Sequence, residues 1–130
     1  MIEVTLPWPS PKLNPNTARR LHWGKRASLA KRYKRDCGWA CVAAGVRPAG
    51  FAHAKVAVTF HPPDAQRRDL DNMLAAIKAG LDAVSAALRI DDSLFDLSLS
   101  RGAPRPGGAV VLRIVDAEPP SAPNPEAIAS

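Results

Sequence analysis

Carboxylates and arginines crowd into one short segment of the chain, Asp64 to Asn72, which reads Asp-Ala-Gln-Arg-Arg-Asp-Leu-Asp-Asn. Within this segment, Asp69 and Asp71 lie close enough in sequence to act together, and a further pair, Asp91 and Asp92, follows later in the chain. Carboxylate oxygens are the ligands that hard cations such as Mg²⁺ prefer. The sequence therefore predicts a divalent-cation site built from Asp69, Asp71 and a member of the later pair.

An apolar stripe predicts the helix that must position the first two aspartates. Its members are three and four residues apart: Leu70, Met73, Leu74, Ile77, Leu81, Val84 and Leu88. Asp69 would be the N-cap and Asp71 would lie in the first turn, where the helix dipole keeps carboxylates ionised. Because residues two apart in a helix point about 200° apart, the two can share a metal only if one lies outside the regular helix. Alternatively, Asp69 only caps this helix and Asp71 only complements its dipole.

A lysine is predicted on the same flank of this helix as Asp71. Asp71, Ala75, Lys78 and Asp82 lie within about 60° of one another on a regular helix. Lys78 could there position a phosphate or neutralise charge on a leaving group. The alternative is that Lys78 forms an ion pair with Asp82, four residues later.

The charge balance favours an anionic partner. The 130 residues include 18 Lys and Arg against 12 Asp and Glu, a formal net charge of +6, and nucleic acid is the commonest partner of such a chain. Trp23 could stack on an unpaired base or pack on its own domain, whereas Trp8, between two prolines, is interpreted as structural. The residues predicted to contact DNA phosphates are Arg19, Arg20, Lys25, Arg26, Lys31, Arg32, Lys34, Arg35, Arg67 and Arg68.

Hydrophobic periodicity predicts an α+β domain with the element order β-α-β-α-β-β, a mixed sheet and two helices packed mainly on one face. The expected strands are Ile2–Leu6 and the segments around 55–60, 95–100 and 110–114, and the first helix runs from about 26–28 to Ala44. Cys37 and Cys41 lie four apart on the buried side of that helix and are interpreted as small core residues. Residues 1–116 form the predicted domain and 117–130 a Pro- and Ala-rich disordered tail. No membrane span or signal peptide is recognised, so a cytoplasmic location is expected.

Three segments together resemble a known family. Leu6-Pro7-Trp8-Pro9, the block Arg67-Arg68-Asp69-Leu70-Asp71-Asn72 and the Asp91-Asp92 pair, in that order, are similar to the RusA family of Holliday junction resolvases of bacteria, their phages and prophages. The resemblance extends over roughly residues 2 to 115.

The resemblance implies a homodimer that binds a four-way DNA junction and makes paired nicks with Mg²⁺ or Mn²⁺, without a small-molecule cofactor. The three aspartates of the family's motif match Asp69, Asp71 and Asp92, with Asp91 as an alternative third ligand. The family often carries a functional lysine four residues after the second aspartate; this position is Ala75 here, and Lys78 is the predicted replacement. The alternatives are a basic nucleic-acid-binding module without catalysis, and a related metal nuclease that nicks flaps or duplexes.

Overall fold

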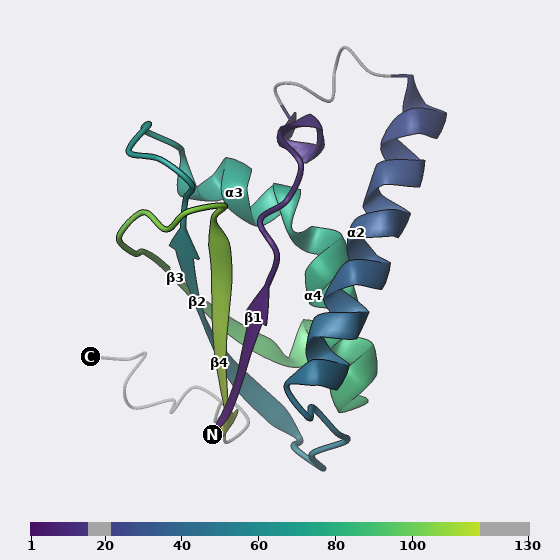
Figure 1. The fold of residues 1–130 in the computed structure, drawn as a ribbon. Coiled ribbons are helices and arrows are strands. Elements are labelled where there is room, and N and C mark those ends of the chain that lie inside the picture. Colours follow the sequence, from purple (N-terminus) through teal and green to yellow (C-terminus); the bar gives the residue numbers. More distant parts are fainter. Residues whose placement is uncertain (16–21, 118–130) are drawn as a thin grey trace, which may run out of the picture.

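The computed structural model describes residues 1–15 and 22–117. Figure 1 shows the course of the chain. In order, its elements are strand β1 (Ile2–Leu6), the 3₁₀ helix η1 (Pro11–Leu13), helix α2 (Trp23–Ala43), strand β2 (His53–His61), helices α3 (Leu70–Ala76) and α4 (Lys78–Leu88), the 3₁₀ helix η2 (Asp92–Leu94), and strands β3 (Phe95–Arg101) and β4 (Ala109–Ala117).

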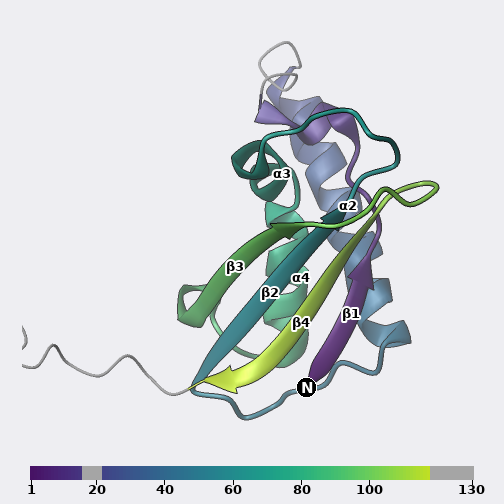
Figure 2. The same cartoon turned by 90° about the vertical axis from the view of Figure 1, so that its left-hand side faces the viewer.

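The four strands form one mixed sheet with the order β1-β4-β2-β3. Strand β2 runs parallel to β3, with Ala54 opposite Phe95, and antiparallel to β4, which also pairs antiparallel with β1. The connection from β2 to β3 passes through α3 and α4, as a parallel pair requires. Helices α2, α3 and α4 all lie on one side of the sheet (Figures 1 and 2). The predicted α+β class with a mixed sheet is confirmed.

The core lies between the sheet and α2 and α4. Alternate residues of β2, namely Ala54, Val56, Val58 and Phe60, are fully buried, as expected for a strand with one covered face. Cys37 and Cys41 of α2 are buried and free, and burial raises the pKa of Cys37 to about 12. The interpretation of both cysteines as core residues is confirmed.

Two predicted helix boundaries were wrong. The helix expected from Leu70 to Leu88 is two helices, with Ile77 between them at φ −98° and ψ 7°. Ile77 is neither glycine nor proline, so the local sequence does not mark the break, although Leu81 still donates to the Ile77 carbonyl at 3.0 Å. Helix α2 begins at Trp23, earlier than expected, because the His22 side chain accepts a hydrogen bond from the Gly24 N–H at 3.2 Å and so caps it.

The last strand ends at Ala117, one residue past the predicted domain boundary. The rest of the predicted tail lies outside the described residues. None of the helices in the described ranges has the length and apolar character needed to cross a membrane.

Candidate metal and DNA-binding site

A cavity of about 410 Å³ lies between helices α3 and α4 and the edge strand β3. Asp71 of α3, Lys78 of α4 and Asp92 of η2 line it, together with Ala75 and the apolar side chains Leu74, Leu81, Phe95 and Leu97. All three of these charged residues are exposed. The cavity thus brings together three of the four residues that the sequence predicted to be catalytic.

The start of α3 determines where the first two aspartates lie. Asp69 is the N-cap, with an extended backbone at φ −78° and ψ 135°, and its carbonyl accepts the first helical hydrogen bond from Met73 at 3.0 Å. Its carboxylate makes no capping hydrogen bond, and Asp71 follows in the first turn. Asp69 therefore lies outside the regular helix, which is the condition for the two carboxylates to approach each other.

Asp69 does not line the cavity of Asp71 and Asp92. Within residues 1–15 and 22–117, no three His, Cys, Asp or Glu side chains lie close enough together to hold a metal ion. The cavity accordingly offers two carboxylates rather than the predicted three.

The adjacent Asp91 and Asp92 have different surroundings. The Asp91 carboxylate caps η2 by accepting a hydrogen bond from the Ser93 N–H at 2.9 Å, and this hydrogen bond is the main reason that its pKa is lowered. Asp92 is the first residue of η2 and lines the cavity. The short helix thus directs Asp92, and not Asp91, to the cavity.

Lys78 lies between two cavities. It also lines a neighbouring cavity of about 380 Å³, where α2 contributes Arg26 and α4 contributes Asp82. The ion pairs of the described residues do not include one between Lys78 and Asp82. Lys78 therefore connects the cavity of Asp71 and Asp92 with the basic surface of α2.

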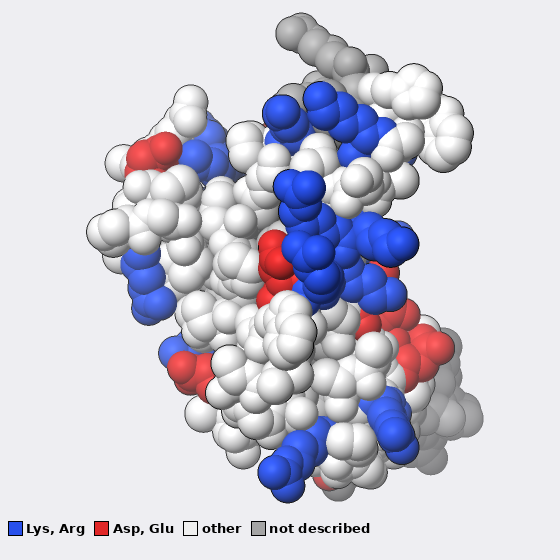
Figure 3. Space-filling model, turned by 45° about the vertical axis from the view of Figure 1, so that its right-hand side comes forward, with Lys and Arg blue, Asp and Glu red and all other residues white. Residues whose placement is uncertain are grey.

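Helix α2 presents a strongly basic surface to solvent. Figure 3 shows Lys and Arg gathered over the side of the molecule that α2 forms, with acidic residues beside them. Arg35 lies 3.6 Å from Asp36, an exposed contact that leaves most of the positive charge uncompensated. The exposed cations of α2 that were predicted to bind DNA are Lys25, Arg26, Lys31, Arg32, Lys34 and Arg35; Arg19 and Arg20 lie outside the described residues.

Two exposed tryptophans accompany this charge. Trp23 is 75% exposed and stacks on His22, with ring centroids 5.7 Å apart, so it does not pack into the core. Sequence analysis did not predict a role for Trp39, which is 66% exposed on α2, four residues after Arg35. Helical periodicity places Trp39 off the buried stripe of Tyr33 and Cys37, so the sequence did contain a signal that this side chain is exposed.

The two arginines before Asp69 differ from each other. The Arg68 guanidinium pairs with the Asp64 carboxylate at 2.8 Å and lies 5.7 Å from the Trp8 ring centroid. Trp8 is itself half-buried against Phe60, so its structural interpretation is confirmed. Arg67 is exposed and has no ion pair within the described ranges, which leaves its charge available to a ligand.

Comparisons with known proteins find a relative, but they do not indicate an activity. No model of a known protein family matches the sequence. A protein of Xylella fastidiosa (strain Temecula1 / ATCC 700964), named an uncharacterized protein, is 35% identical over 102 residues. The aligned region covers 73% of this chain and 63% of that protein, so the chain spans less than two thirds of its relative.

Proposed function

We propose that the protein is a metal-dependent, structure-selective endodeoxyribonuclease that resolves four-way DNA junctions by paired nicks. The observation that carries this proposal is the cavity in which Asp71, Asp92 and Lys78 meet beside the basic surface of α2. The similarity of the three sequence segments to RusA-family resolvases supports the four-way junction as substrate.

The donor set fits Mg²⁺ or Mn²⁺. Magnesium is commonly bound through one or two carboxylates together with substrate phosphates, and Asp71 and Asp92 supply two hard oxygen donors at one exposed cavity. The Asp69 carboxylate, which makes no capping hydrogen bond at the N-terminus of α3, is a candidate third ligand. A divalent ion bound there would polarise a phosphate and lower the pKa of a bound water.

The protein's own side chains bind and orient the substrate. Lys78 lines the cavity, where its ammonium can neutralise charge that develops on a leaving oxygen. The cations of α2 hold the DNA arms through phosphates, which give affinity but little sequence selectivity. Bare carboxylates on a DNA-facing surface would weaken binding unless a cation is recruited, and this consideration favours a nuclease over a simple binding module.

A homodimer is part of the proposal because a four-way junction has near two-fold symmetry and must be cut on two strands. The helices of the described chain cover one face of the sheet and leave the other open (Figure 2), and this open face is available to a second copy. Light scattering at micromolar concentration should give about twice the chain mass of 13.9 kDa. A monomer that still makes symmetric paired nicks would contradict the dimer.

The nuclease is tested on four-way, flap and linear DNA of matched sequence, each with Mg²⁺ or with EDTA. Paired nicks in the four-way junction, only with Mg²⁺, are expected. Cleavage of flaps or simple duplexes instead would identify a related metal nuclease. Binding to all three DNAs without cleavage would identify a non-catalytic binding module.

A further inference from the structure

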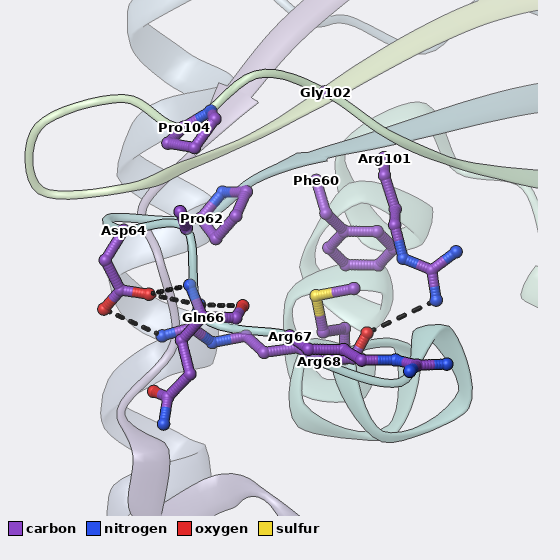
Figure 4. A pocket seen from close by; sticks show the side chains of 11 residues that line it. Phe60, Pro62, Asp64, Gln66, Arg67, Arg68, Arg101, Gly102 and Pro104 are labelled. Carbon is purple, nitrogen blue, oxygen red and sulfur yellow. Dashed lines mark hydrogen bonds and ion pairs between the residues drawn. The ribbon is translucent and has the colours of Figure 1, made fainter.

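A third cavity, also of about 380 Å³, opens at the C-terminal end of β3 (Figure 4). Its apolar lining includes Phe60 and Met73, which are buried, and Pro62 and Pro104. The loops that follow β2 and β3 form its walls, and Gly102 lies among them. Such a slot, apolar at its base and open to solvent, suits a flat aromatic group.

The charged residues of this cavity are not distributed evenly. In Figure 4 the side chains of Arg67 and Arg68 extend in opposite directions, so that Arg68 faces Asp64 whereas Arg67 lies on the side of Arg101. Arg68 is neutralised there by its two contacts with Asp64, at 2.8 and 3.2 Å. Arg101 donates to the Arg68 carbonyl at 3.3 Å, and neither it nor Arg67 forms an ion pair within the described ranges. One side of the slot is thus neutral, and the other carries two uncompensated positive charges.

We infer that this slot binds one unpaired nucleotide of a DNA strand, with its base against Pro62 and Pro104 and over Met73, and its phosphate on Arg67 and Arg101. A base stacks on an apolar surface through its π-face, whatever its identity, and a guanidinium fork binds phosphate oxygens through paired hydrogen bonds. The inference rests on the proposed function only in taking DNA as the ligand.

The slot lies close to the cavity of Asp71 and Asp92. Leu97 of β3 lines that cavity and Arg101 lines the slot, and four residues of strand span about 13 Å. This length corresponds to about four nucleotides at the rise of one strand in duplex DNA. A base held in the slot would therefore fix the position of the strand that passes the carboxylates, and would favour branched DNA, where bases are unpaired, over intact duplex.

The two methionines of the chain make this inference directly measurable. Met73 lines the slot, whereas Met1 is 83% exposed at the chain start. With the methyl groups labelled with ¹³C, the full chain is titrated in EDTA with a thymidine tetranucleotide and with an abasic oligomer that has the same number of phosphates. The tetranucleotide should shift the Met73 methyl resonance until saturation and leave Met1 unmoved, and the abasic oligomer should shift neither.

Variants that remove one positive charge distinguish binding in the slot from general electrostatic attraction to DNA. Arg67→Ala, which removes an exposed side chain, should weaken the tetranucleotide's effect on Met73 about tenfold, as expected for one charge-assisted contact. Arg105→Ala, on the loop after β3 but outside the slot, removes the same charge and should change it less than twofold.

Equal shifts from both oligomers, or an unmoved Met73 at concentrations that saturate binding by fluorescence anisotropy, would overturn the inference. Because no cleavage is required, an inactive nuclease whose Met73 responds would refute only the proposed function.

Discussion

Two regions of this molecule differ in how they are packed: the contact between α2 and α4 is tight, whereas the margin of the sheet at β3 is open to solvent. At the first, Gly80 of α4 approaches α2 so closely that an added Cβ would lie 2.9 Å from Cys37 Sγ and 2.9 Å from Tyr33 Cε2. At the second, Asp71, Lys78 and Asp92 are exposed around an open cavity. The same helix pair α3–α4 contributes to both.

Because of this difference, we expect the first region to determine stability and the second to determine the proposed chemistry. Buried, close-packed atoms lose favourable contacts when they are changed, so residues at the α2–α4 contact should affect the free energy of unfolding. Exposed charges at the margin already interact with water, so their removal should cost little stability. If the proposed function holds, changes at the margin should instead affect cleavage.

The largest expected effect is that of Asp71→Asn, which keeps the side-chain shape and removes a carboxylate from the cavity. Nicking of a four-way junction with Mg²⁺ should fall by a factor of about 10³ or more, because a charge that no neighbour replaces is lost. Junction binding should be unchanged or tighter, since a negative charge near DNA has been removed. Single-turnover cleavage and gel-shift assays measure the two, with Asp96→Asn on β3, outside this cavity, as the matched control. Wild-type cleavage by the Asp71 variant would remove this residue from the site.

Asp91 and Asp92 are adjacent, but only Asp92 lines the cavity, so variants of the two compare a cavity residue with its neighbour. Asp92→Asn should reduce the cleavage rate about 10²-fold or more, because Asp92 lines the cavity. Asp91→Asn should change it by less than about fivefold, since an amide oxygen can still accept the Ser93 N–H. Cleavage rates of the two variants at equal stability test this, and the reverse ranking would make Asp91 the ligand.

This pair also illustrates what the sequence could predict. Periodicity of three and four was enough to predict the buried stripes of α2 and of the α3–α4 segment, because burial repeats along many residues. Whether Asp91 or Asp92 faces the cavity depends on one turn of 3₁₀ helix, and adjacent identical residues give no periodic signal. The break at Ile77 and the approach of Arg101 to the loop before α3 depend on tertiary packing, so neither was predicted.

Lys78 should have an intermediate effect at the same margin. Lys78→Ala should slow single-turnover cleavage about 10- to 100-fold, the scale expected for one electrostatic donor. Lys78→Arg should restore part of the rate because it retains the charge, and thermal unfolding should be little changed in both variants. An unchanged rate in Lys78→Ala would exclude a catalytic contribution and leave Lys78 as a solvated surface residue.

Two glycine substitutions compare the α2–α4 contact with an open helix surface. Gly80→Ala and Gly38→Ala make the same chemical change in helices, and each gains about 1 kcal/mol of helix propensity. An added Cβ at Gly38 meets nothing within 4 Å, whereas at Gly80 it collides with α2. The overpacking should cost Gly80→Ala about 1–3 kcal/mol relative to Gly38→Ala in urea unfolding. Equal unfolding free energies would show that α4 can shift away from α2 without loss.

The smallest effect concerns a single hydrogen bond beside that contact. The Tyr33 hydroxyl of α2 donates to the Pro7 carbonyl at 2.8 Å, directly after β1, and burial raises the pKa of Tyr33. Tyr33→Phe keeps the ring in the core and leaves the partly buried Pro7 carbonyl without this donor, so it should lower the free energy of unfolding by about 1 kcal/mol. Ser100→Ala removes the exposed hydrogen bond to Thr59, 3.1 Å long, and a weaker contact with the Val58 carbonyl at 3.5 Å, and should change stability by less than about 0.5 kcal/mol. Urea unfolding followed by circular dichroism compares the two variants. A larger loss of unfolding free energy in Ser100→Ala than in Tyr33→Phe would contradict this expectation. An exposed strand contact would then contribute more than the contact that joins α2 to the end of β1, so stability would not be concentrated where α2 meets the rest of the core.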